Sequence, residues 1–280
     1  MSAPVRKAAV AGSWYPGDRD ALAAEVGGYL AAIGPHALAG RLVALIAPHA
    51  GFRYSGPVAA HAYAQLGGRS TLTAILVGPS HRVAFDGVSV CARGAFETPL
   101  GRVPIAEPVA EALIAAHPKI TADPWPHRQE HSLEMQLPFL QHLVRDVRIV
   151  PALLGTQARS EVELLAAALS GVASSGDTVL IASSDLSHYH PADEANALDA
   201  RVAEHVRRFD PEGLMDRLES YRGHACGGGA IVAVMKAART VGARRAEVLR
   251  YADSGDVAEG DKTRVVGYLA AALTTAEAAA

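Results

Sequence analysis

A short aliphatic run that ends in a histidine-containing turn is the feature that most constrains this chain. Residues 42–47 (LVALIA) have the length and aliphatic content of a strand that is buried on both faces of a sheet. Pro48 ends that run, and Gly51 permits the turn that follows. In an open α/β sheet, ligands bind just beyond the carboxyl ends of the strands. We therefore expect His49 to lie at the edge of a ligand-binding groove.

The same order of residues recurs along the chain. The run LTAILV at 72–77 leads through glycine, proline and serine into His81. The run TVLIA at 178–182 leads into Asp185 and His188. A histidine that only fills a core has no reason to follow strand ends repeatedly. We therefore interpret these side chains as residues of one site rather than as packing residues.

Helical patterns alternate with the strand candidates, which is typical of an α/β protein. The patterns predict helices at 19–33, 57–66, 107–117 and 193–209, and two more that begin at Pro211 and after Gly229. Pro57 lies in the first turn of the second helix. A further helix is capped by Ser160 with Glu163 and stops at Gly171. Further strand candidates lie at 7–11, 88–91, 147–154, 247–251 and 265–269, with a turn at 97–101. We expect one α/β domain over residues 1–280, with a mostly parallel or mixed central sheet, helices on both faces and a frayed tail at 274–280.

Two further stretches carry polar or reactive side chains. The segment 121–141 is dense in polar groups, and its His131 and Glu134 are three residues apart, a spacing that would place them on one helix face. Cys226 precedes three glycines and an apolar helical pattern, so we place it at a helix N-terminus. Amide dipoles there favour a thiolate, although a small buried residue is an equal interpretation.

The composition excludes several classes of protein. The 280 residues include 26 lysines and arginines against 29 acidic residues, a net charge of −3 without long runs of either sign, which argues against a nucleic-acid surface. No apolar run is long enough to cross a bilayer. The apolar stretch at the N-terminus is too short for a secretion signal. We therefore expect a cytoplasmic protein whose two cysteines are free thiols.

Three chemistries fit a rim that carries His49, His81, Asp185, His188 and Cys226. Two histidines and an anionic ligand can hold a transition metal and leave positions open for substrate or dioxygen. Alternatively, Cys226 is the nucleophile of a hydrolase, with a histidine as its base and Asp185 as the orienting group. In the third reading, the pocket is a closed zinc site or binds a small molecule or peptide without turnover.

The motifs resemble one known family over most of the chain. PHAGFRYSGPVAAHAY, GPSHR, ETPLG, HSLEMQLPFL, VPALLG, SSDLSHY and ACGGGAI occur in the order seen in the Memo family, also called AmmeMemoRadiSam system protein B. That family is similar in fold to the class III extradiol dioxygenases, which have a LigB-like α/β architecture and a non-haem metal pocket. The dioxygenases have a glutamate as third ligand where the Memo family, like this chain, has cysteine.

The resemblance implies roles for six residues. It makes His49, His81 and Cys226 the metal ligands, with iron as the first expectation and copper or zinc as alternatives. It gives Asp185 and His188 the positions of a catalytic base or of a group that supports the metal ligands, and it places His131, the third catalytic candidate, in the pocket lining. It also implies a redox function of the oxidoreductase type and, by analogy with prokaryotic members, a radical-SAM protein and an AMMECR-type protein as partners.

Overall fold

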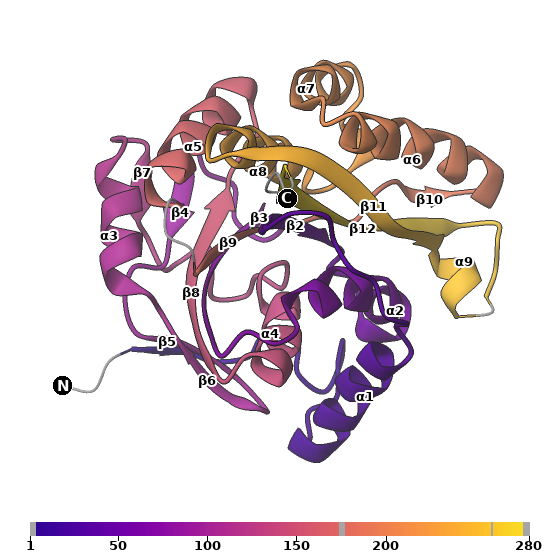
Figure 1. Cartoon of the computed structure of the whole chain (residues 1–280), viewed down its shortest axis with the longest axis horizontal. Coiled ribbons are helices and arrows are strands. Elements are labelled where there is room, and N and C mark those ends of the chain that lie inside the picture. The colour runs from indigo at the N-terminus through magenta and orange to yellow at the C-terminus, as the bar shows by residue number, and fades with distance from the viewer. Residues whose placement is uncertain (1–3, 174–176, 259, 277–280) are drawn as a thin grey trace.

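Four parallel strands form the centre of a mixed sheet. The computed structural model describes residues 4–173, 177–258 and 260–276. Its central strands, in spatial order, are β2 (Leu42–Ala47), β9 (Thr178–Ser183), β3 (Thr71–Pro79) and β8 (Asp146–Leu154), and all four are mutually parallel (Figure 1). Side chains of β2 are buried on both faces, as its unbroken aliphatic sequence predicts.

Antiparallel strands extend this centre on both sides. Next to β2 lies β12 (Val265–Thr275), which pairs antiparallel with β2, with β11 (Ala243–Asp253) and with the short β10 (His188–His190). On the other side, β4 (Val88–Val90) pairs antiparallel with β8 and parallel with β7 (Ile120–Ala122). The sheet is therefore mixed with a parallel centre, and the predicted fold class is confirmed.

Helices cover both faces of the sheet (Figure 1). One group consists of α1 (Arg19–Ala31), α2 (Phe52–Tyr63) and α4 (Leu137–Leu143), which pack on one another. The opposite group includes α5 (Arg159–Val172), α6 (Ala192–Arg207), α7 (Pro211–Ser220) and α8 (Gly228–Thr240). The remaining helices are α3 (Glu107–Ala115) and the short α9 (Ser254–Val257). No helix among the described residues is long and apolar enough to cross a membrane.

A small second sheet ties the N-terminal segment to the body. It contains β1 (Val5–Arg6), β5 (Ala95–Thr98) and β6 (Gly101–Pro104), in the order β1-β5-β6. The predicted strand at 7–11 is therefore displaced, because the chain pairs with β5 only at Val5 and Arg6. The predicted turn at 97–101 is the hairpin between β5 and β6, with its first two residues inside β5.

Two predicted helix starts are wrong. α2 begins at Phe52, directly after the His49 turn, and Pro57 lies inside it. Burial of the Phe52 ring against Tyr15 and Phe139, at ring distances of 5.5 Å and 5.2 Å, accounts for the earlier start. The Ser160–Glu163 capping box is also absent: Ala158 precedes α5 without a side-chain cap.

The start of the predicted frayed tail at 274–280 is wrong, because β12 extends through its first two residues. Thr274 and Thr275 belong to β12, and Thr274 is buried beside β2. Residues 277–280 of the predicted frayed tail lie outside the described residues.

Candidate metal centre

The carboxyl ends of three central strands bring the candidate side chains together. His49 follows β2, His81 follows β3 and Asp185 follows β9, while Cys226 precedes α8. One ligand atom from each of His49, His81 and His131 lies within 4.8 Å of the other two, and the same is true of His49, Asp185 and Cys226. His49 is thus the member common to two groups of donors. Cys226 and His81 belong to different groups.

Hydrogen bonds determine which nitrogen of His49 carries the proton. The Nδ1 atom lies 2.8 Å from Oγ of Ser183, whose hydroxyl donates to the carbonyl of Ser132 at 2.7 Å. A serine hydroxyl has one proton, so Ser183 must accept from Nδ1–H of His49. The Nε2 atom therefore bears the free lone pair, and it faces Sγ of Cys226 at 3.2 Å.

Gln136 keeps Ser183 in this orientation. Its amide nitrogen donates to Oγ of Ser183 at 2.8 Å and to the carbonyls of Pro48 and Ser132, each at 3.2 Å. Its amide oxygen accepts from the hydroxyl of Tyr63 at 2.6 Å. A buried amide with every polar atom paired holds a fixed position, so the His49 tautomer is built into the fold.

Glu130 orients the ring of His81, as Ser183 orients that of His49. Its Oε1 lies 2.9 Å from Nδ1 of His81 and accepts from the amides of His131 and Ser132, while Oε2 accepts from the amide of His81. Burial raises the pKa of this carboxyl, but the hydrogen bond and attraction to the His81 ring, together with the hydrogen bonds from the Ser132 and His81 amides, outweigh burial and lower the pKa to about 2. An ionised carboxylate only accepts hydrogen bonds, so Nδ1 of His81 donates, and Nε2 is the nitrogen that remains for a metal.

His131 lies between two rings. Its imidazole stacks on His81 with ring centroids 4.5 Å apart and an interplanar angle of 23°. The Trp14 ring lies 4.3 Å away in a tilted arrangement, with an interplanar angle of 52°. Its Nδ1 is buried without a hydrogen-bond partner among the described residues, although Oε1 of Glu130 is 3.3 Å away. Burial, followed by the nearby His49, lowers the pKa of His131 to about 3. His131 is therefore a neutral ring with an unused buried nitrogen.

The expected pairing of His131 with Glu134 is wrong. Glu134 lies in a 3-10 turn (Glu134–Gln136) that His131 precedes. Its carboxylate accepts hydrogen bonds from the amides of Ala9 and Val10 and from the hydroxyl of Tyr15, so it anchors the N-terminal segment. Because the chain has not yet entered a helix at His131, the three-residue spacing does not place both side chains on one face.

Cys226 occupies the predicted position before a helix, with Gly227 as the N-cap of α8. Its Sγ lies 3.2 Å from Nε2 of His49 and 3.6 Å from the carbonyl of Asp185. Burial, followed by the charge of Asp185, raises the pKa of the Cys226 thiol far above its ordinary value. In the metal-free protein these effects exceed the stabilisation of a thiolate by the helix dipole, so the sulfur is a thiol.

The carboxylate of Asp185 fixes the backbone of the turn that contains His49. Its Oδ1 accepts from the amides of His49 at 2.7 Å and Ala50 at 3.2 Å. Burial raises the pKa of this carboxyl, whereas burial lowers the pKa of the neighbouring His188. His188 lies in β10, belongs to neither group of donors, and has an Nε2 without a hydrogen-bond partner among the described residues.

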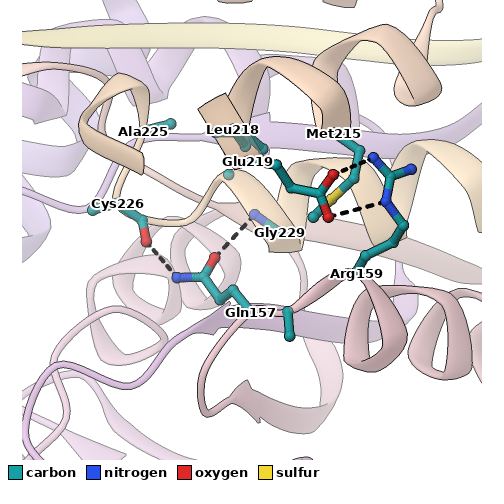
Figure 2. A pocket seen from close by; sticks show the side chains of 10 residues that line it. Gln157, Arg159, Met215, Leu218, Glu219, Ala225, Cys226 and Gly229 are labelled. Atoms are coloured by element: carbon teal, nitrogen blue, oxygen red, sulfur yellow. Dashed lines mark hydrogen bonds and ion pairs between the residues drawn. The ribbon is translucent and has the colours of Figure 1, made fainter. Parts of the chain in front are cut away.

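Gln157 fixes the turn that carries Cys226, and Figure 2 shows this contact at the edge of a cavity of about 240 Å³. Its amide nitrogen donates to the carbonyl of Cys226 at 2.8 Å, and its amide oxygen accepts from the amide of Gly229 at 2.9 Å. Gln157 has φ of 56°, a left-handed conformation that is uncommon for a residue with a side chain.

The residues that sequence reasoning missed are the orienting ones. Glu130 was visible only as one polar residue of the 121–141 segment, although its place directly before His131 is a usable signal. Ser183 ends the strand before Asp185, which is a similar signal. Nothing in the sequence marks Gln157.

Comparison with known proteins finds relatives along almost the whole chain. The model of the family described as "Memo-like protein" matches residues 6–272. A MEMO1 family protein of Methanothermobacter thermautotrophicus is 39% identical over 278 residues, covering 94% of this chain and 98% of the relative. A MEMO1 family protein of Methanosarcina barkeri is 40% identical over 271 residues, covering 95% and 98%.

One solved structure is similar in fold. The crystal structure of an uncharacterized protein from Escherichia coli K12 has a TM-score of 0.56, and it covers 83% of this chain and 99% of its own at 14% identity. At that identity the likeness concerns the fold alone. The family model and the relatives extend over almost the whole length described here, and on that ground the chain belongs to the Memo family.

Proposed function

We propose that this protein binds a transition metal, iron first and copper or zinc as alternatives, through His49, His81 and Cys226, and that the metal serves a redox reaction. The observation that carries the proposal is the fixed orientation of two imidazoles. Ser183 and Glu130 occupy Nδ1 of His49 and His81, which leaves Nε2 of each ring as the nitrogen available to a metal. A metal-binding histidine has this arrangement, with its second nitrogen bonded to a neighbour.

The donor set matches soft and borderline metals. Imidazole nitrogen and thiolate sulfur favour iron, copper and zinc over magnesium or calcium. The Cys226 thiol must lose its proton to become a ligand, and a cation beside it would offset the burial that opposes ionisation. His131, whose ligand atom lies within 4.8 Å of those of His49 and His81, is the alternative third donor on the other side of His49. A bound iron or copper ion would supply one-electron chemistry and an open coordination position.

His188 and Asp185 are the groups we assign to proton handling. His188 is neutral near pH 7 because burial lowers its pKa, and its unpaired Nε2 can accept a proton. The nearby Asp185 carboxylate would stabilise the imidazolium that results. His131 would line the pocket, where it stacks on His81 and contacts the tilted ring of Trp14.

Metal analysis of anaerobically purified protein tests the assignment. We expect wild-type protein to carry iron or copper in a fixed ratio and the His49→Ala and Cys226→Ser variants to lose most of it. Cys91→Ser and His117→Ala are the matched controls, because neither residue belongs to either group of donors. Metal content in the two site variants equal to that of wild type would refute the proposal.

A cysteine hydrolase is the second candidate, favoured by the 3.2 Å contact between Sγ of Cys226 and Nε2 of His49. Its test is alkylation of Cys226 in metal-free protein. Stoichiometric labelling at mildly acidic pH, with loss of a hydrolytic activity in step, would support it. The raised pKa of the Cys226 thiol leads us to expect slow labelling there instead.

The partner and compartment assignments rest on family membership. We propose a radical-SAM protein and an AMMECR-type protein as partners in the cytoplasm. Anaerobic co-purification of tagged full-length protein with each candidate from the source cell is the test, and recovery of neither would refute the assignment.

A further inference from the structure

A second cavity lies away from the candidate metal centre. It has a volume of about 510 Å³ and lies between β1, the segment that follows β4 and the segment that follows β7. None of the six candidate metal or catalytic residues is among the residues that line it. Cavities of this size commonly hold small organic molecules.

The charged side chains that line this cavity are cationic. Lys7, Arg93 and Arg128 line it, and neither an aspartate nor a glutamate is among the described residues that do. Lys7 and Arg93 reach acidic partners outside the lining, Glu97 and Glu111, but both cations are 71% exposed. Exposed ion pairs of this kind contribute little free energy, so a bound anion can compete for them.

Arg128 is the cation with the most freedom. Its guanidinium lies over the ring of Trp125, 5.0 Å from the centroid, and it has no ion pair among the described residues. Arg6, the fourth cation of the lining, differs because its side chain is only 7% exposed and its hydrogen bonds go to Glu134 and to backbone carbonyls. The Arg6 side chain is therefore fixed in the cavity wall, whereas the three exposed cations can turn toward a ligand.

Apart from Gln129, the rest of the lining is small and apolar. Alanines from three separate segments, Ala8, Ala95 and Ala122, contribute to it together with the buried Cys91. Short side chains leave the space open, and an apolar surface beneath cationic side chains matches a molecule with an apolar body and an anionic head. We propose that this cavity binds small organic anions of that kind, independently of any metal at His49.

The naphthalene sulfonate 8-anilinonaphthalene-1-sulfonate is a suitable probe, because its emission rises when it enters an apolar site. N-phenyl-1-naphthylamine, which lacks the sulfonate, is its neutral counterpart. We expect saturable binding of the sulfonate to the full-length protein, at least about tenfold tighter than binding of the neutral compound, since only the sulfonate can make a charge-assisted contact with the cations. Equal affinity for both compounds would overturn the proposal.

Two variants locate the site. Arg93→Ala combined with Arg128→Ala should weaken sulfonate binding about tenfold or more and leave binding of the neutral compound unaffected. The control combines Arg148→Ala with Arg207→Ala, which removes the same charge elsewhere. It should change the binding of neither compound. Ala122→Trp, which fills the cavity without changing charge, should abolish binding of both. In a Trp14→Phe background, bound sulfonate should also quench Trp125 by energy transfer. Sulfonate binding that is unchanged in the double arginine variant and in Ala122→Trp would overturn the proposal.

Discussion

The Sγ atom of Cys226 lies 3.2 Å from Nε2 of His49, although 177 residues separate the two in the chain. The end of β9 joins them. Ser183 bonds the far side of the His49 ring, and the next residue, Ser184, accepts from the amide of Gly227 at 2.9 Å. Successive residues point to opposite sides of a strand. The end of β9 therefore lies between the His49 ring and the turn that carries Cys226, and it orients both.

Acid should destabilise the metal-free protein through its buried histidines. Burial, followed by neighbouring imidazoles, lowers the pKa of His49 and His131 to about 3, from an ordinary value of 6.5. The unfolded chain therefore binds protons below pH 6.5 that the folded protein does not bind until about pH 3. Stability should be full above pH 6.5 and fall toward pH 3, by at most about 1.4 kcal/mol per pH unit for each histidine.

Urea unfolding between pH 7.5 and pH 4 measures this slope. His131→Asn should unfold with a shallower dependence on pH than wild type, since one titrating group is lost. His36→Asn, at an exposed position, should keep the wild-type slope. Parallel curves for wild type and His131→Asn would contradict the assignment.

The four central strands were predictable because each is an aliphatic run that a glycine, proline or polar residue ends. The bounds of β2 are those that the aliphatic run at 42–47 predicts, and Asp210 caps α7 at Pro211 as the sequence indicates. The gathering of His49, His81 and Asp185 followed from the rule that parallel strands end at one edge. These features need only neighbouring residues or a general property of sheets.

The orienting contacts were not predictable, because their partners are distant in the chain. Glu130 lies 49 residues from His81, Ser183 lies 134 residues from His49, and Gln157 lies 69 residues from Cys226. Local spacing holds no information on which carboxylate or amide faces which ring. Tertiary packing likewise moved the start of α2 to Phe52, where a local reading favours Pro57.

Glu130→Gln should weaken metal binding without unfolding the protein. The amide oxygen can still accept from the backbone of His131 and Ser132, but the negative charge that fixes Nδ1–H of His81 is lost. Loss of such a partner of a metal-binding histidine costs roughly 10–100-fold in affinity. Competition with a chelator measures it, and Glu97→Gln, at an exposed ion pair, is the control. Unchanged affinity would separate Glu130 from metal binding.

Gln157→Ala should make Cys226 more reactive. The variant removes the bonds to the Cys226 carbonyl and to the Gly229 amide, so the turn before α8 opens more often. Loss of about 1.4 kcal/mol of local stability corresponds to roughly tenfold faster alkylation. Mass spectrometry of iodoacetamide-treated, metal-free protein gives the rate, with Cys91 as internal reference.

Gln141→Ala is the matched control, because that amide bonds Thr98 and Gly101 instead. A rise in Cys226 labelling in both variants would point to general loosening. An unchanged rate in Gln157→Ala would show that the amide does not hold the turn.

Arg6→Ala should be the most destabilising substitution in the N-terminal segment. Arg6 and Glu134 form an ion pair whose side chains are 7% and 0% exposed. Removing one partner leaves the Glu134 carboxylate buried without a counter-charge, which typically costs about 3–5 kcal/mol. The neighbouring Lys7, whose pair with Glu97 is exposed, should cost less than about 1 kcal/mol when changed to alanine. Urea unfolding measures both values, and equal losses would mean that the Glu134 carboxylate is satisfied by Tyr15 and the Ala9 and Val10 amides alone.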